Sequence, residues 1–379
     1  MNTKIEELLK LLPKGYEKAC YETKAIERKR TVQTPEELLV LCLYYLYGTS
    51  LVETSQLAKM NAIGTLSDVA FMKRFTKSKS WFQWMTQNIK PEAIMHYQKP
   101  KLLEDYHVVA IDASDVFTKG AAKQTFHLHY AIDLFSLNCS QFNITEQSTG
   151  ETLKNFDVKK KDLVLADRAY ATITGIEYCI EHGADFILRI KNKPFHLYNE
   201  KKENILLTDW LKTVKEGVSE TTVYFKDNKK NFQPLRICAL PKTEEEIKKE
   251  EKRLRKKESK KQITISDDTK FSHHYVFVAT SLPESFSAED ILKLYRLRWQ
   301  VEMVFKRYKS ILGLGSIPTK IKDATEAWLD GKMLLALLIE KFLGSVDFSP
   351  SGNRGKKQES MERNQTGIFI DFSSYHAEN

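Results

Sequence analysis

The sequence predicts a mixed α/β protein with a helical amino-terminal part and a mainly β insertion. The first 100 residues show the apolar periodicity of helices. From about residue 105 the apolar residues come instead in short runs typical of strands, with one helical stretch among them. A second strand-rich stretch at 194–282 separates these strands from a long amphipathic helix. This order of strands and helices favours a mixed sheet in a chain long enough for two or three domains.

The helical part contains a pattern that resembles a helix-turn-helix. Thr34–Glu37 combines an N-cap threonine, a proline at the first helical position and two acids, which is a typical helix start. Further on, two amphipathic segments at 50–60 and 66–85 are joined by a turn that contains a glycine. Lys73 and Arg74 lie on the second segment, where they could bind DNA. The alternative is an ordinary helical bundle with solvated cations.

Two of the predicted strands run directly into an aspartate. The apolar run 107–111 precedes Asp112, and the run 163–166 precedes Asp167. If these strands are neighbours, both carboxylates emerge at the same edge of the sheet, where open α/β sheets usually hold their active sites. The other elements predicted in this part are strands at 125–134, 140–149 and 186–191 and a helix that ends at Gly183.

The insertion at 194–282 contains three predicted strands and a highly charged run at 243–262. The charged run is either a solvated helix or loop, or a loop that clamps DNA. After the insertion, Ser287–Asp290 has the spacing of a capping box, and we expect it to begin one helix from Ala288 to Leu312.

Four polar residues share one narrow face of that expected helix. At 100° per residue, Arg298, Glu302 and Lys309 lie within about 60° of Tyr295, beside the apolar face. Arg298 and Glu302 are four residues apart and could form a simple surface ion pair. That pair would not account for the two aspartates at strand ends. Three converging carboxylates would instead supply the oxygen ligands that Mg²⁺ or Mn²⁺ require, and two such ions can promote cleavage of a phosphodiester.

The same residues resemble the signature of a known enzyme family. The pattern Y-x2-R-x3-E-x6-K of bacterial DDE transposases of the insertion-sequence-four type is matched by Tyr295, Arg298, Glu302 and Lys309. LADRAY around Asp167 resembles the DRGY segment of the family, and IDAS around Asp112 resembles its D-G-T segment. The resemblance covers roughly residues 30–343. It implies a ribonuclease H-like catalytic core and cut-and-paste transposition, with a DNA hairpin as intermediate.

The resemblance also implies roles for individual residues. The catalytic residues, which would hold two Mg²⁺ or Mn²⁺ ions, are Asp112, Asp167 and Glu302. The residues that would hold phosphates of the DNA end are Tyr295, Arg298 and Lys309. Two further candidates for DNA contact are Trp299, which would stack on a base or pack in the core, and Arg189, which would bind a phosphate or be an ordinary surface arginine.

Composition agrees with a DNA-binding protein in a reducing compartment. The net charge of +9 favours a polyanionic partner. The five cysteines form no CxxC pair, which argues against structural zinc and disulfides. No apolar run approaches the roughly 20 residues of a membrane span, and no signal peptide is evident. We therefore expect a cytoplasmic protein. The resemblance implies, in addition, a bacterial, nucleoid-associated protein that binds the inverted-repeat ends of a transposon and target DNA, as a homodimer in the synaptic complex.

The expected domain organisation follows these segments. It comprises a DNA-end-binding part at 1–100, a catalytic core at 101–193 and 283–343, the insertion at 194–282 and a disordered tail at 344–379. Two alternatives to an active transposase remain open. One is a DNA-binding protein of transposase ancestry that does not cut, because the sequence after the last apolar helix departs from the family pattern. The other is a hydrolase with a carboxylate pair, such as a glycosidase, which would leave the basic charge unexplained.

Overall fold

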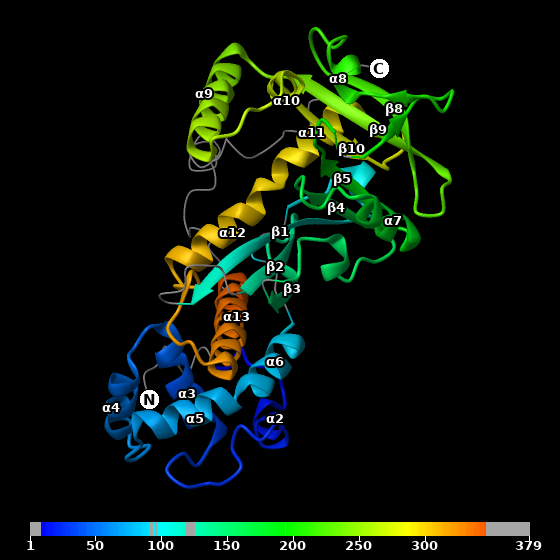
Figure 1. Cartoon of the computed structure of the whole chain (residues 1–379). Coiled ribbons are helices and arrows are strands. Elements are labelled where there is room, and N and C mark those ends of the chain that lie inside the picture. Colours follow the sequence, from blue (N-terminus) through cyan, green and yellow to red (C-terminus); the bar gives the residue numbers. More distant parts are fainter. Residues whose placement is uncertain are drawn as a thin grey trace, which may run out of the picture.

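The computed structural model confirms the predicted mixed α/β class. It describes residues 9–90, 94, 97–118, 126–146, 148–193 and 195–345. The tail expected at 344–379 therefore lies outside the described residues, apart from its first two positions. One long mixed sheet occupies the middle and upper part of the molecule in Figure 1, and the helices of the amino-terminal part lie below it.

The secondary structure elements have the following bounds. The strands are β1 His107–Thr118, β2 Phe126–Asp133, β3 Cys139–Glu146, β4 Asp162–Ala166, β5 Asp185–Arg189, β6 Leu197–Tyr198, β7 Asn204–Ile205, β8 Ser219–Lys226, β9 Phe232–Pro241, β10 Tyr275–Thr280 and β11 Ser316–Ile317. The helices are α2 Tyr16–Glu22, α3 Pro35–Tyr47, α4 Leu51–Met60, α5 Asp68–Lys77, α6 Lys79–Asn88, α7 Ile173–Glu181, α8 Leu207–Leu211, α9 Glu244–Lys261, α10 Asp267–Ser272, α11 Ala288–Leu297, α12 Trp299–Ser310 and α13 Lys322–Ser345.

The sheet has the strand order β3-β2-β1-β4-β5-β10-β9-β8-β6-β7, and β11 pairs with β1. The two-residue strands β6, β7 and β11 were not predicted from the sequence. β1, β4 and β5 are parallel, whereas β2 and β3 are antiparallel to their neighbours. All five residues of β4 are buried, as expected for a parallel strand covered on both faces.

The predicted end of the first strand at Ile111 is wrong. β1 continues through Asp112 to Thr118, because its second half pairs with β2 as far as Val116 and with β11 at Phe117 and Thr118. Backbone pairing on both sides keeps this polar segment extended even though its apolar run has ended. Asp112 consequently lies in the middle of a strand and is held at a fixed position along it.

The insertion extends the same sheet beyond β5. β10 pairs antiparallel with β5, and β9 and β8 follow it. The charged run forms α9, which begins with a capping box between Thr243 and Glu246 and buries only Leu254. This agrees with a largely solvated helix.

The helix expected from Ala288 to Leu312 is divided at Arg298 into α11 and α12. The Val301 N–H donates to the carbonyl of Arg298, and the Arg298 N–H donates to the carbonyl of Tyr295, so the turn here is the tighter i→i−3 type. α12 ends at Ser310. Ile311 is therefore beyond the helix and is exposed.

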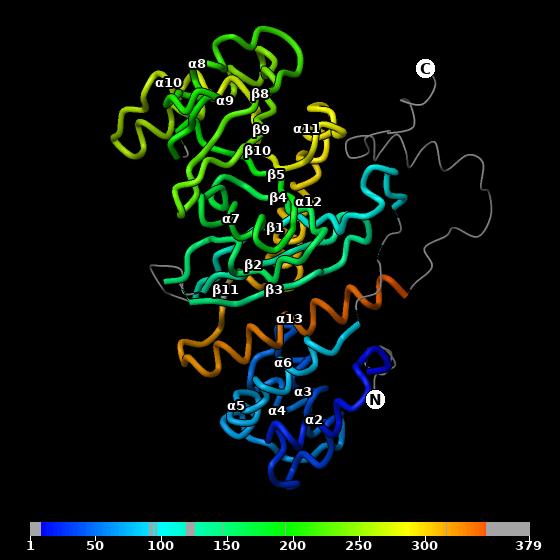
Figure 2. The backbone as a smooth tube through the Cα atoms, turned by 90° about the vertical axis from the view of Figure 1, so that its right-hand side faces the viewer, coloured from blue at the N-terminus to red at the C-terminus, as the bar shows by residue number. Residues whose placement is uncertain are grey.

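The last helix packs among the first ones. α13 contacts α3, α5 and α6 on one side and β11 on the other. In Figure 2 it lies between the sheet and the amino-terminal helices. Its side chains from Ala324 to Leu338 are nearly all buried, and a single apolar cluster extends from these helices to β1 and β2. No helix in the described part of the chain, α13 included, is long and apolar enough to cross a membrane.

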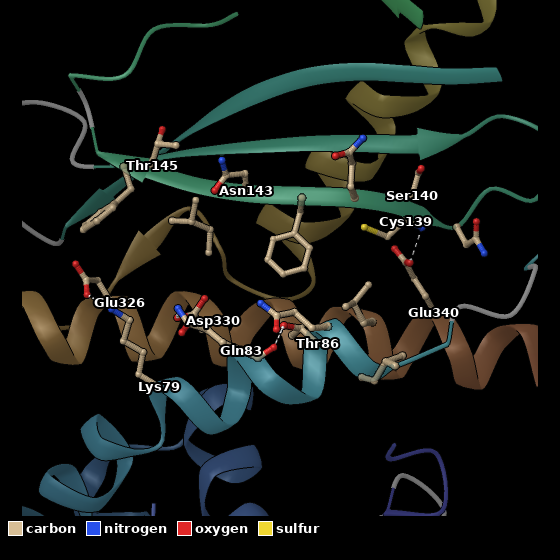
Figure 3. Close-up of a pocket in the computed structure, with 18 of the residues that line it drawn as sticks. Lys79, Gln83, Thr86, Cys139, Ser140, Asn143, Thr145, Glu326, Asp330 and Glu340 are labelled. Carbon is tan, nitrogen blue, oxygen red and sulfur yellow. Dashed lines mark hydrogen bonds and ion pairs between the residues drawn. The ribbon is translucent and has the colours of Figure 1, made fainter. Parts of the chain in front are cut away.

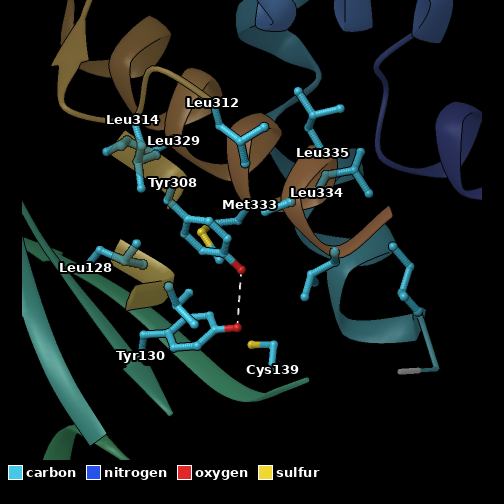
Figure 4. Packing of buried hydrophobic residues seen from close by; sticks show 14 of the residues in the cluster. Leu128, Tyr130, Cys139, Tyr308, Leu312, Leu314, Leu329, Met333, Leu334 and Leu335 are labelled. Carbon is cyan, nitrogen blue, oxygen red and sulfur yellow. Dashed lines mark hydrogen bonds between the residues drawn. The ribbon is translucent and has the colours of Figure 1, made fainter. Parts of the chain in front are cut away.

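A buried carboxylate attaches α13 to the sheet and to α12. Glu340 accepts the backbone N–H of Cys139 at 3.0 Å (Figure 3). It also accepts the hydroxyls of Tyr130 at 2.9 Å and Tyr308 at 2.5 Å, and these two hydroxyls lie 3.2 Å apart (Figure 4). Burial raises the pKa of Glu340, but its hydrogen bonds satisfy the carboxylate. β2, β3, α12 and α13 therefore share one polar contact inside an apolar core.

Close packing at Gly331 leads to a stability prediction. A Cβ at this position in α13 would lie 2.8 Å from Leu46 and 3.2 Å from Phe82. We expect Gly331→Val to lower the free energy of unfolding by about 1–3 kcal/mol, because the contact with α3 and α6 would be overpacked. Thermal denaturation followed by circular dichroism measures this. Gly150→Val is the matched control, since a Cβ there meets no atom within 4 Å. Equal stability of the two variants would contradict the prediction.

Candidate active site

The pairing of β1 with β4 places two aspartates at the same level. The register joins each β1 residue to the β4 residue 55 positions later, from His107 with Asp162 to Ala110 with Leu165. Asp167 follows Asp112 by the same interval, immediately after β4 ends. Parallel neighbours at one level are separated by about 4.8 Å and point to the same face of the sheet. Continued for two residues beyond Ala110 and Leu165, this register would bring the two acids to one level, and their meeting stays a prediction.

Asp112 is held in a partly desolvated position. Its Oδ1 accepts the backbone N–H of Ala113 at 2.9 Å, and its side chain is 21% exposed. Burial raises the pKa of Asp112 to about 6, and the negative charges of Asp167 and Glu151 add to the effect. The Ala113 N–H and the Arg298 guanidinium oppose it. A carboxylate in this environment gains from a nearby cation.

Asp167 begins a tight turn into α7. Its carboxylate accepts the backbone N–H of Ala169 at 3.1 Å, and its carbonyl accepts that of Tyr170 at 3.2 Å. A cavity of about 320 Å³ lies beside this turn and is lined partly by Arg168, Lys191 and other residues of the segment before α7. The turn that follows Asp167 therefore borders a cavity with two cations in its wall.

Arg298 lies between the first aspartate and the helical glutamate. Its Nη1 is 3.5 Å from Asp112 Oδ2, and its Nη2 donates to the Glu302 carboxylate. The Arg298 side chain is only 12% exposed, and its guanidinium carbon is 5.9 Å from the ring centre of Tyr295. The expected pair with Glu302 is thus present, but it is not a simple surface pair, because the same arginine also reaches Asp112 across the contact of α12 with β1.

The three acids suit a hard divalent cation in their chemistry but are not assembled around one point. Carboxylate oxygens are the ligands that Mg²⁺ and Mn²⁺ prefer. Within the described ranges, however, no three His, Cys, Asp or Glu side chains are close enough to hold a metal ion. Asp112 and Asp167 share a level of the sheet, whereas the Arg298 guanidinium separates Glu302 from Asp112. A site with all three ligands would require Glu302 and Arg298 to rearrange.

Two cations that were not predicted from the sequence, Arg168 and Lys242, lie near Arg189, and Arg168 follows Asp167 directly. Burial lowers the pKa of Arg168, and the neighbouring charge of Arg189 lowers it further. Burial also lowers the pKa of Lys242, which follows β9, and the charges of Arg189 and Arg168 add to this. The predicted phosphate candidate Arg189 therefore belongs to a group of three cations. Arg168 could have been noticed from the sequence, because it follows Asp167 directly. Lys242 could not, because only the pairing of β9 with β10 and of β10 with β5 brings it near Arg189.

The other signature residues differ in their surroundings. Tyr295 is buried next to Arg298, and Trp299 is half-buried at the start of α12. Lys309 is exposed near the end of α12, so it lies along the helix from the acids and not among them. The structure thus groups Tyr295 with the acids and leaves Lys309 accessible to a larger ligand.

Lys73 and Arg74 lie on α5, in the helical part and away from the acids (Figure 1). Arg74 donates to the carbonyl of Arg28 at 3.2 Å, and Lys73 is exposed. α4 and α5 contact each other across a short turn, as a helix-turn-helix would. These cations do not take part in the acid site.

A larger cavity is separate from the acids. It measures about 620 Å³ and lies between β3, α6 and α13 (Figure 3). Burial raises the pKa of Asp330 in its wall to about 7, and Gln83 donates to that carboxylate at 2.9 Å. Asp112, Asp167 and Glu302 do not line this cavity.

Comparisons with known proteins identify relatives along nearly the whole chain. A family model described as a transposase DDE domain matches residues 103–339, which include all three acids. A protein named as a transposase for insertion sequence element IS186A of Escherichia coli (strain K12) is 27% identical over 357 residues, covering 91% of this chain and 95% of that protein. The transposase for IS421 of Escherichia coli is 27% identical over 358 residues, with the same coverage. The transposase for IS231E of Bacillus thuringiensis subsp. finitimus is 26% identical, covering 86% of this chain and 77% of that protein.

The environment of Asp112 leads to a prediction about pH and stability. The pKa of about 6 is above the ordinary value of 3.8, so the folded chain binds this proton more tightly than the unfolded chain does. Ionisation of Asp112 therefore costs stability, which is lost as pH rises from about 4 to 6. We expect Asp112→Asn to be more stable than the wild type by about 1–3 kcal/mol at pH 7.5 and no more stable at pH 4. Thermal denaturation at both pH values checks this, and an equal or lower stability of the variant at pH 7.5 would refute it.

Proposed function

This chain belongs to the family of DDE transposases, of the insertion-sequence-four type, and from this premise we propose that it cleaves DNA at the ends of an insertion sequence and joins them to target DNA. The observation that carries the proposal is the parallel register of β1 with β4, which pairs Ala110 with Leu165, the residues two positions before Asp112 and Asp167. α12 adds Glu302 from the facing side, and Arg298 connects it to Asp112.

We assign Asp112, Asp167 and Glu302 as the ligands of two Mg²⁺ or Mn²⁺ ions. Their oxygen donors fit these ions, and burial, with the neighbouring charges of Asp167 and Glu151, raises the pKa of Asp112, so a cation nearby would favour its ionised form. When bound, such ions would supply an activated oxygen nucleophile and stabilise the leaving oxygen of the phosphodiester. The backbone N–H groups of Ala113 and Ala169 would keep the two aspartates oriented.

The proposed catalytic core has a ribonuclease H-like arrangement. The strand order β3-β2-β1-β4-β5, with only β2 and β3 antiparallel to their neighbours, supports this. We propose that residues 101–193 and 283–343 form this core, that 194–282 are an insertion into it, and that 1–100 bind the DNA end.

The DNA strand to be cut would lie along the cationic side of the site. Arg168 follows Asp167 directly, and Arg189 and Lys242 lie near Arg168; these cations would bind phosphates on either side of the scissile bond. Tyr295 and Lys309 would extend these contacts along α11 and α12, and Trp299 would stack on a base. The helix-turn-helix-like pair α4 and α5 would bind duplex DNA through Lys73 and Arg74.

In the proposed reaction, water first cleaves one strand at the transposon end and releases a 3′-hydroxyl. This hydroxyl attacks the opposite strand and forms a hairpin, which a second water opens. The 3′-hydroxyl then attacks a phosphodiester of the target, and a target 3′-oxygen leaves. Each step exchanges one oxygen for another at phosphorus, so one site can perform all of them. Two ends must be joined together, which favours a homodimer on the DNA.

A second candidate function is a DNA-binding protein that does not cut. It is favoured by the absence, among the described residues, of three metal-binding side chains around one point, and by the pairing of Arg298 with two of the acids. The two functions make opposite predictions for nicking but the same prediction for binding.

Replacement of Glu302 separates the two functions. We expect the wild type to nick a plasmid that carries the DNA flanking its gene, in the presence of Mg²⁺ or Mn²⁺, and Glu302→Gln to reduce the nicking rate by at least about 100-fold while DNA affinity changes little. The control is Glu289→Gln, which removes an exposed glutamate of α11. Agarose gels and gel-shift titrations provide the measurements. Binding that weakens with salt, without nicking by the wild type, would support the non-cutting function, and undiminished nicking by Glu302→Gln would remove Glu302 from the site.

A further inference from the structure

We propose that Arg298 is an internal counter-ion of the acid site, which occupies the position between Asp112 and Glu302 until a divalent cation takes its place. The inference rests on the proposed function, since it concerns the same three acids. It goes further by assigning two alternative arrangements to one arginine.

The contacts of Arg298 are those of a substitute cation. One terminal nitrogen faces Asp112 Oδ2 at 3.5 Å, and the other donates to Glu302. These acids come from different elements, β1 and α12, so the arginine neutralises charge across the site and not along one helix. At 12% exposure the guanidinium is largely removed from water, where its attraction to carboxylates is stronger than on the surface.

The contact with Asp112 is the weaker of the two. In the part of the chain that the structure describes, Arg298 Nη1 is buried without any hydrogen bond, and its approach to Asp112 is an ion pair longer than a good hydrogen bond. A buried donor without an acceptor costs free energy. Arg298 therefore compensates the acids incompletely, and a small cation that several carboxylate oxygens surround would compensate them better.

The position of Arg298 on the backbone would let its side chain leave the acids and still remain close to the site. Arg298 stands at the tight turn between α11 and α12, and its guanidinium already lies beside the Tyr295 ring at 5.9 Å. Once released from the acids, it would remain next to the site with all five N–H donors free. A guanidinium of this kind is suited to a DNA phosphate. Arg298 would therefore pair with protein carboxylates in the empty site and with substrate in the loaded one.

Competition of this kind predicts that Arg298 weakens metal binding in the absence of DNA. We expect Arg298→Gln to bind Mn²⁺ at least about tenfold more tightly than the wild type, because a cation no longer has to be displaced. Arg298→Lys keeps a point charge and should stay within about threefold of the wild type. Arg296→Gln, an exposed arginine of α11, is the control for the loss of one positive charge and should change the affinity less than twofold.

The experiment is an isothermal titration of the full chain with Mn²⁺ alone at low salt, repeated by electron paramagnetic resonance of free Mn²⁺. Circular dichroism establishes that each variant is folded. If Arg298→Gln does not fold, Arg298→Met, which keeps an unbranched apolar side chain at the joint, replaces it. The double variant Arg298→Gln/Asp112→Asn should lose the gain in affinity, which assigns the tighter binding to this site.

Unchanged or weaker Mn²⁺ binding by Arg298→Gln, or no binding by any variant, would overturn the counter-ion role. These outcomes differ from a failure of the proposed function. If Mn²⁺ binds more tightly without Arg298 but the wild type never nicks DNA, the counter-ion role is supported and the cutting activity is refuted. If the wild type nicks DNA but the loss of Arg298 does not change Mn²⁺ binding, the cutting activity is supported and the counter-ion role is refuted.

Discussion

The parallel pairing of β1 with β4 determines the arrangement of the site more than any side-chain contact does. It sets Asp112 level with Asp167, and a slip by one residue would turn one carboxylate to the opposite face of the sheet. The register is strongly fixed, because all of β4 and residues Val108–Ile111 of β1 are buried between apolar layers. Continued pairing of β1 with β2 and β11 past Asp112 keeps that aspartate from fraying into a loop.

The third acid depends on packing at a distance. Glu302 is exposed on α12, whose adjacent face is buried through Val301, Val304 and Phe305. Further along, Tyr308 attaches the same helix to Glu340 of α13, which is itself packed against the amino-terminal helices. The position of Glu302 relative to β1 is therefore coupled to a core formed by both ends of the described chain. Residues far from the acids can influence their geometry through this core.

Repulsion between the carboxylates of the site is a physical reason for the presence of cations beside them. Carboxylates at one level of a sheet repel each other, and burial makes the repulsion stronger. Arg298 relieves it on the side of α12, while Arg168 lies beside Asp167 with Arg189 and Lys242 near it. Burial is the main cause of the lowered pKa values of Arg168 and Lys242, and the neighbouring cations add to it, whereas Glu250 pairs with Lys242 at 3.7 Å. The site thus combines a group of acids with a group of cations. A DNA backbone on the cationic side and divalent ions among the acids would satisfy both, which is the physical basis of the proposed function.

The sequence by itself determined the strands before Asp112 and Asp167, the mixed α/β class and the spacing from Tyr295 to Lys309, because apolar runs, caps and helical periodicity are local properties of the chain. Only the tertiary structure decided that β1 continues past Asp112, that the helix divides at Arg298, that Lys242 joins Arg168 and Arg189, and that α13 packs among the first helices. Each of these depends on partners from remote segments. Pairing and burial between such segments leave no periodic signal in either segment alone, so the fold had to bring them together before they could be recognised.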